Sequence, residues 1–213
     1  MKSIILSLLP RFSKLNHSTR IISCIALLFS FLLMEQASAQ STSTNPNLML
    51  GGFLDLADGT LNVDSIVLMD SIVESGTINA TSLVYCTALD TNASAANPSY
   101  DEINVKIQGT AALYISPNCI ATLSIANTYT GGTIIDGSEV VITGEGTLGA
   151  NNGALILTNG ATLDLGGTTQ IQQSVTPNDG SIMNGTIIAT STATITTYDA
   201  NGNVVSPASA PAK

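Results

Sequence analysis

The segment Gly160-Ala-Thr-Leu-Asp-Leu-Gly-Gly167 alternates apolar and polar residues between glycines. Successive side chains of a β-strand point to opposite faces, so Ala161, Leu163 and Leu165 would share one face. The two polar residues between them would face solvent. Glycine adopts backbone angles that other residues avoid, so the flanking glycines indicate turns at both ends. This stretch therefore predicts a short strand with one buried face.

The same pattern recurs along the chain, from residue 48 onward. Glycine followed by a small or β-branched residue and an apolar run occurs in Gly59-Thr-Leu-Asn-Val, Gly76-Thr-Ile-Asn-Ala, Gly109-Thr-Ala-Ala-Leu, Gly146-Thr-Leu-Gly-Ala, Gly160-Ala-Thr-Leu-Asp and Gly185-Thr-Ile-Ile-Ala. Such self-similarity is typical of repeat architectures. Threonine, valine and isoleucine favour extended conformations, and no amphipathic helical period is present.

The spacing of these glycines favours a solenoid with loops of variable length. The interval from Gly76 to Gly109 is more than twice the interval from Gly146 to Gly160, which excludes a strict short repeat. We predict an all-β fold, a right-handed single-stranded parallel β-helix, whose coils bury their apolar faces only by stacking on neighbours. The expected organisation is a signal peptide at 1–39, a flexible leader at 40–47, the β-helix at 48–205 with an inserted loop at 87–101, and a disordered tail at 206–213.

A more specific motif lies within residues 124–167. It comprises Ala-Asn-Thr-Tyr-Thr-Gly-Gly-Thr-Ile-Ile-Asp-Gly from Ala126 to Gly137, then Gly146-Thr-Leu-Gly, then the Gly160 segment quoted above. This order resembles the autotransporter-associated β-strand repeat, with the closest match at Asn127, Tyr129, Gly131, Gly132 and Thr133. The resemblance implies a passenger-type β-helix and no particular activity.

The N-terminal segment has the features of a secretory signal peptide. Four basic residues precede an apolar run from Ile21 to Leu33, and Ala37-Ser-Ala39 follows. The run is shorter than the roughly 20 residues that a membrane-spanning helix needs. We expect cleavage between Ala39 and Gln40 and export to the extracellular space or outer surface of a bacterium, with no membrane span in the mature chain.

Charge and composition exclude several function classes. The whole chain has 15 acidic and 6 basic residues, and only 10% of its residues are charged. After cleavage, the basic side chains are Lys106 and Lys213 and the formal charge is −12. Nucleic acid is excluded as a partner, because its binding needs clustered cations. The mature chain also lacks histidine, since His17 lies in the signal peptide, which excludes imidazole-based nucleophilic catalysis.

Carboxylate pairs are the remaining candidates for catalysis, because glycoside hydrolysis uses two carboxyl groups. The nearest pairs in sequence are Asp64 with Asp70, Asp101 with Glu102, and Asp136 with Glu139. In so acidic a chain, we interpret them as solvated turn and strand positions. We predict no catalytic residues, no cofactor and no metal site.

Six aromatic residues, Phe53, Tyr85, Tyr100, Tyr114, Tyr129 and Tyr198, are scattered along the mature chain without pairing in the sequence. Tyr129 is the most conspicuous, because flat rings often contact sugars. It lies inside the repeat motif, so we predict that its ring packs at a corner instead.

The two remaining cysteines predict a disulfide. Cys86 and Cys119 flank the proposed loop at 87–101, and when this loop is left out the chain between them is close to one coil in length. Stacked rungs would bring them within bonding range, and export favours oxidation. The alternative is two buried, unpaired thiols.

Together, these features predict an exported cell-surface or secreted protein with a structural or adhesive role. Its expected partners are extracellular surface or matrix components, including glycans, and it could associate end to end with further copies. The alternative is a small carbohydrate-active or glycan-binding β-helix.

Overall fold

The computed structural model describes residues 47–88, 93–192 and 194–209, and every regular element in these ranges is a β-strand. The predicted signal peptide, the Ala39–Gln40 cleavage site and most of the leader lie outside the described residues. Asn47 already begins the first strand. The strands are β1 (Asn47–Thr87), β2 (Ser99–Gly109), β3 (Ala112–Ile115), β4 (Cys119–Leu123), β5 (Thr133–Asp136), β6 (Glu139–Ile142), β7 (Ala154–Thr158), β8 (Thr162–Asp164), β9 (Thr169–Gln172), β10 (Ser174–Thr176), β11 (Ser181–Met183), β12 (Gly185–Ala189), β13 (Thr194–Tyr198) and β14 (Val204–Ser209).

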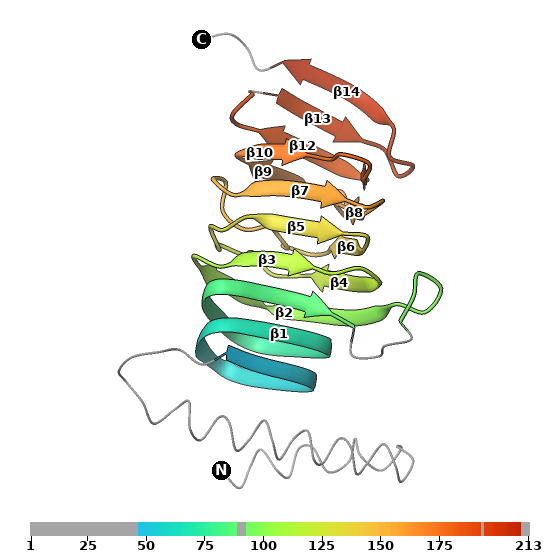
Figure 1. Cartoon of the computed structure of the whole chain (residues 1–213). Coiled ribbons are helices and arrows are strands. Elements are labelled where there is room, and N and C mark those ends of the chain that lie inside the picture. The colour runs from blue at the N-terminus through green and yellow to red at the C-terminus, as the bar shows by residue number, and fades with distance from the viewer. Residues whose placement is uncertain (1–46, 89–92, 193, 210–213) are drawn as a thin grey trace, which may run out of the picture. The chain divides into compact units, whose positions relative to one another are not determined.

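These strands form a β-solenoid of about five turns. Strand β1 winds around the first coils, and β3, β5, β7 and β10 stack on it in order, all parallel (Figure 1). The second side carries β2, β4, β6, β8 and β11, also parallel. In Figure 1, β3, β5 and β7 run to the right on the near side as the chain rises, so the coil is right-handed. The predicted parallel β-helix is confirmed.

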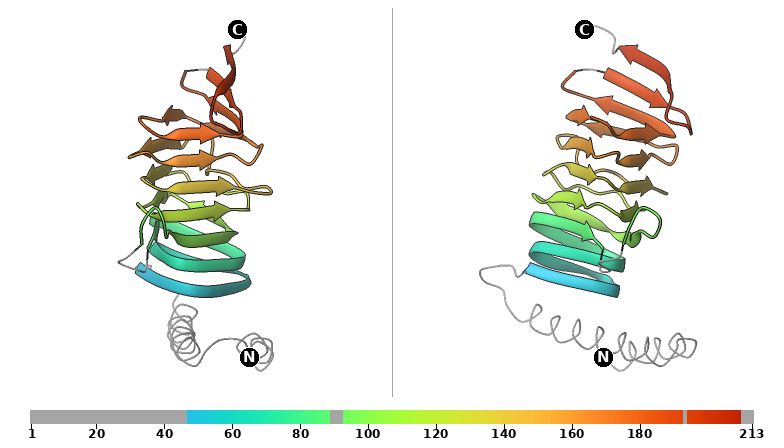
Figure 2. Two further views of the ribbon diagram at one scale, coloured as in Figure 1. Left: turned by 90° about the vertical axis from the view of Figure 1, so that its right-hand side faces the viewer. Right: turned by 45° about the vertical axis from the view of Figure 1, so that its right-hand side comes forward.

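Strands β9 and β12 form a third side, which ends in an antiparallel extension. Strand β12 pairs in parallel with β9, and then β13 and β14 add antiparallel to it (Figure 2). Strand β14 continues to Ser209, so the prediction of a disordered tail from residue 206 is wrong for residues 206–209. Backbone pairing with β13 orders this Pro- and Ala-containing segment, a long-range effect that composition does not reveal.

The core fills the inside of the coil with stacked apolar side chains. One interior column is Leu113, Thr133, Leu155 and Val175, and each member is paired in register with the next. As predicted, Ala161, Leu163 and Leu165 are fully buried. Burying one such leucine or isoleucine contributes about 1.5–3 kcal/mol, so every coil depends on its neighbours for this stabilisation.

The coil length explains why the glycine spacing is irregular. The steps from Leu113 to Thr133, to Leu155 and to Val175 are nearly equal, whereas the step from Val84 to Leu113 is clearly longer. The longer step contains the inserted loop. Thr87 ends β1 and Ser99 begins β2, so both ends of the predicted loop at 87–101 belong to strands.

Candidate functional site

The repeat motif forms structural corners inside the stack. The buried Asn127 side chain accepts a hydrogen bond from the Ile107 amide at 2.7 Å and donates one to the Thr147 carbonyl at 2.9 Å. It thereby links three successive coils where regular strand pairing is interrupted. The Tyr129 ring is fully buried, and its hydroxyl shares a 2.7 Å hydrogen bond with Thr133. Tyr129 therefore packs inside a corner, as predicted.

The two glycines of the motif are required by close approach of neighbouring coils. A Cβ atom on Gly131 would lie 2.5 Å from the Ala112 nitrogen. Gly132 has a φ of +85°, and its Cβ would lie 2.6 Å from the Ala154 carbonyl oxygen. Any side chain at either position would push adjacent coils apart. The five motif residues thus build the solenoid.

The three carboxylate pairs named from the sequence do not form paired acids, and the interpretation of these residues as solvated is wrong for Asp101. Asp101 points into the core, where it is 1% exposed, whereas Glu102 lies on the outside of the same strand. Asp136 ends β5 and Glu139 begins β6, so a corner separates them onto different sides of the coil.

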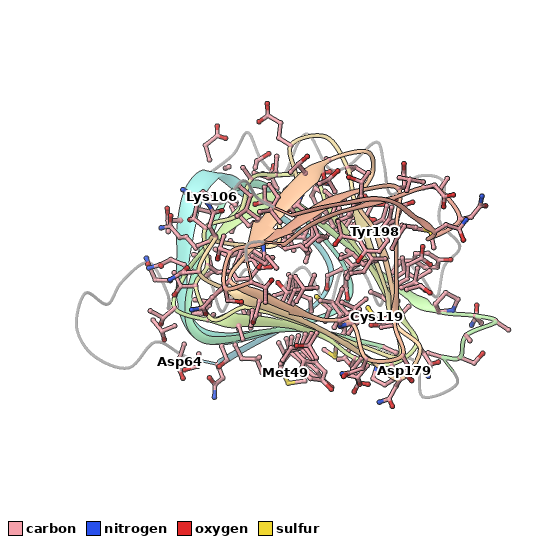
Figure 3. The ribbon with its side chains drawn as sticks, turned by 90° about the horizontal axis from the view of Figure 1, so that it is seen from above. Met49, Asp64, Lys106, Cys119, Asp179 and Tyr198 are labelled. Carbon is pink, nitrogen blue, oxygen red and sulfur yellow. The ribbon has the colours of Figure 1, made fainter. Side chains whose placement is uncertain are left out.

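The remaining pair, Asp64 and Asp70, accepts hydrogen bonds from different neighbours. Asp64 accepts hydrogen bonds of 2.6 Å from both Ser82 and Thr81 in the next coil, and these bonds lower its pKa. Asp70 accepts from the Ser99 hydroxyl at 2.5 Å. These two carboxylates therefore connect neighbouring coils through hydrogen bonds. Asp64 lies on the outside of the stack, as does Lys106 (Figure 3). Within the described residues, no cluster of three or more His, Cys, Asp or Glu side chains could hold a metal ion.

Asp101 belongs to a buried polar cluster that the sequence did not reveal. Its Oδ1 atom accepts from the Ser71 amide at 2.8 Å, and its Oδ2 atom accepts from the Cys119 thiol at 3.3 Å. Burial raises the pKa of Asp101 to about 6, against an ordinary value of 3.8. Burial, followed by the charge of Asp101, also raises the pKa of the thiols of Cys86 and Cys119. Neither thiol is therefore an activated nucleophile.

The register on which the predicted disulfide depended is wrong. Cys86 aligns with Ile115 on the side of β3, whereas Cys119 aligns with Ser99 on the side of β2. The two residues precede and follow a corner and do not stack on each other. Both are buried free thiols in the structure. The length of chain between the two cysteines could not assign each of them to a side of the coil.

The outer surface of β1, β3, β5, β7 and β10 carries the most distinctive feature. Tyr85, Tyr114, Ile134, Ile156 and Thr176 are aligned in register, one on each successive strand. We call these five residues the outer ladder. Its first four members are apolar or aromatic and half-buried. A row of such side chains on an outer face marks a candidate interaction surface.

The tyrosines of the outer ladder form a ring pair beside a hydrogen-bonded carboxylate. The Tyr85 and Tyr114 ring centroids are 5.3 Å apart with an interplanar angle of 50°, so the prediction that the aromatic residues are unpaired is wrong. The Tyr114 hydroxyl donates to Asp136 at 2.6 Å, which raises the pKa of Tyr114 to about 12. The same bond, with one from Asn159 at 2.6 Å, lowers the pKa of Asp136. Asp136 is therefore ionised at neutral pH.

A local pattern could have revealed the outer ladder. Each of its first four members lies between two buried residues, as in Val84-Tyr-Cys86, Leu113-Tyr-Ile115, Thr133-Ile-Ile135 and Leu155-Ile-Leu157. In a strand with an inward face, the middle residue of such a triplet must point outward. An apolar residue in that position is not covered by its own coil. These triplets could therefore have predicted the outer ladder from the sequence.

Helices that could span a membrane are not found in the part of the chain that the structure describes. In comparisons with known proteins, no protein-family model matches the sequence, and no curated protein or solved structure matches it either.

Proposed function

We propose that this protein is an exported structural and adhesive protein of a bacterial surface, built on an autotransporter-like repeat solenoid. The observation that carries the proposal is the outer ladder, because the fold aligns four apolar or aromatic side chains on the outside of successive strands, where they are only half-buried. A rigid stack with such a face is suited to contact with an extended partner.

Further support comes from both ends of the chain. The basic, apolar and small-residue pattern of residues 1–39 supports export, and the motif at 124–167 supports the repeat family. At the other end, Val204 and Val205 on the edge strand β14 are 53% and 59% exposed. An exposed apolar edge strand favours pairing with another chain, which supports the proposed end-to-end association.

The proposal is tested by expressing the full chain with a C-terminal tag in a bacterium with an outer membrane. We expect the exported product to begin at Gln40 by N-terminal sequencing and to be accessible to antibody on intact cells or in the medium. A cytoplasmic product that retains residues 1–39 would refute export. Reproducible depolymerisation of purified polysaccharides would refute the non-catalytic role and favour the carbohydrate-active alternative.

A further inference from the structure

We propose that the outer ladder binds an uncharged, extended polysaccharide of equatorially linked pyranoses, which lies along the axis of the stack. The proposal rests on the adhesive function above and specifies its partner. The rings of Tyr85 and Tyr114, whose planes are inclined at 50°, would each contact one of two successive sugars, and Ile134 and Ile156 would continue the contact.

The repeat distance of the surface suits such a chain. Members of the outer ladder lie on hydrogen-bonded strands, which are about 4.8 Å apart, and the two tyrosine rings are 5.3 Å apart. In a flat, equatorially linked glycan, successive rings follow each other at a similar spacing. The outer ladder can therefore present one side chain to each sugar along several coils.

The chemistry of the surface matches both parts of a sugar ring. Equatorial hydroxyl groups leave the two ring faces covered by C–H groups, which pack against aromatic and aliphatic side chains, while the hydroxyls project from the ring edges. The outer ladder supplies the apolar strip. Beside it, Asp136 is held by Tyr114, Asn159 and Thr158. A charged acceptor held in place in this way forms stronger hydrogen bonds than a neutral one.

The charge of the protein favours a neutral glycan over the competing occupants. All acidic residues except Glu35 and Asp90 lie within the described ranges, where Lys106 is the only basic side chain. An anionic polysaccharide would be repelled by this surface. A peptide strand could not pair here, because the backbone groups of β3, β5 and β7 are already paired on both edges.

The test uses the mature chain, from Gln40 to Lys213, with β-1,4-linked hexasaccharides of glucose, xylose, mannose and N-acetylglucosamine. Binding is measured by isothermal titration calorimetry and by tyrosine fluorescence, which is informative because the chain has no tryptophan. We expect at least one of the four to bind, and polygalacturonate oligomers of the same length not to bind.

Matched variants locate the site. Tyr85→Ala and Tyr114→Ala should each weaken binding by about tenfold or more, whereas Tyr114→Phe, which keeps the ring, should bind within about threefold of the wild type. Tyr100→Ala is the control, because Tyr100 is 58% exposed on β2, on the other side of the coil. If the alanine variants do not fold by circular dichroism, Ile156→Thr, which keeps a β-branched residue, should still weaken binding.

Three outcomes would overturn the proposal: no binding of any of the four hexasaccharides, equal loss of binding in Tyr100→Ala, or a dimer in light scattering that the Tyr85 and Tyr114 variants abolish. The last would show that a second copy covers the outer ladder. If the chain is exported and displayed but binds no glycan, this inference fails and the proposed function stands. If it binds glycan but stays in the cytoplasm, the proposed function fails and this inference stands.

Discussion

Asp101 shows how a single buried acid can oppose the stability of the folded core. The residue is 1% exposed, and its carboxyl group accepts hydrogen bonds from the Ser71 amide and the Cys119 thiol, neither of which carries a positive charge. These two hydrogen bonds favour the ionised form, but burial outweighs them, and the charge of Asp70 adds to the effect of burial. The pKa of Asp101 is therefore raised, and the buried group holds its proton more tightly than a solvated carboxyl.

This gives a pH dependence of defined sign. The pKa of Asp101 is about 6 in the folded protein, whereas the unfolded chain loses this proton near 3.8. The resulting stabilisation is fully present below pH 3.8 and is lost as the pH rises through 6. It amounts to about 3 kcal/mol in the free energy of unfolding.

The Asp101→Asn variant tests this at the residue scale. An amide can accept from Ser71 without ionising, so we expect the variant to match the wild type near pH 4 and to be more stable at pH 7. Urea unfolding at pH 4, 5, 6 and 7 measures the difference. Parallel curves for the two proteins across this range would contradict a raised pKa.

The two cysteines give a second residue-scale prediction. Cys86 and Cys119 are 0% and 1% exposed, and burial raises the pKa of both thiols. We expect native exported protein to react slowly with iodoacetamide and to take up two labels rapidly in denaturant, as measured by mass spectrometry. Protein that takes up no label in denaturant until it is reduced would contradict two free thiols and establish the disulfide.

At the scale of elements, the corners depend on glycine where neighbouring coils touch. Gly149 has a φ of +86°, and a Cβ there would lie 2.7 Å from the Tyr129 ring. Gly160 has a φ of +71°, but a Cβ added there would meet no heavy atom within 4 Å. The two positions therefore separate backbone strain from steric contact.

We predict that Gly149→Ala lowers the stability more than Gly160→Ala does. Gly160→Ala is the control, and it should lower the free energy of unfolding by about 1 kcal/mol, because a non-glycine residue is strained in the left-handed conformation. The Gly149 variant should cost about 1–3 kcal/mol more, because the buried Tyr129 ring must shift in a filled core. Thermal unfolding followed by circular dichroism measures both. Equal melting temperatures would mean that the Tyr129 corner is loosely packed.

For the whole molecule, stability comes from contacts between neighbouring coils. Strand β4 stacks between β2 and β6, and β5 stacks between β3 and β7, so each coil covers the next. Removing the coils before Asn118 would expose the interior column at Thr133 and unpair one edge of β4 and β5. Such edges pair readily with other chains.

The fragment from Asn118 to Lys213 tests this dependence. We expect it to keep β-structure by circular dichroism, to melt at a lower temperature than the chain from Gln40, and to associate with increasing concentration in light scattering. A fragment that stays monomeric and melts at an undiminished temperature would contradict a stack held by neighbours.

The sequence by itself determined the solenoid, because the information for it is local. Alternation in Ala161, Leu163 and Leu165 specifies an inward face within a single strand, and Gly131 and Gly132 mark a corner without reference to distant residues. The motif at Asn127 and Tyr129 was likewise interpretable from its own residues.

Only the tertiary structure decided which residues lie side by side. The chain from Tyr85 to Tyr114 is longer than the chain from Tyr114 to Ile134, yet both pairs are in register. Because coil length varies, the sequence did not show that Cys86 and Cys119 lie on different sides of the coil. For the same reason, it did not predict the cluster around Asp101. The physical reason is that a loop can lengthen a coil at little cost in free energy, so neighbours across the stack depend on coil closure and not on separation in sequence.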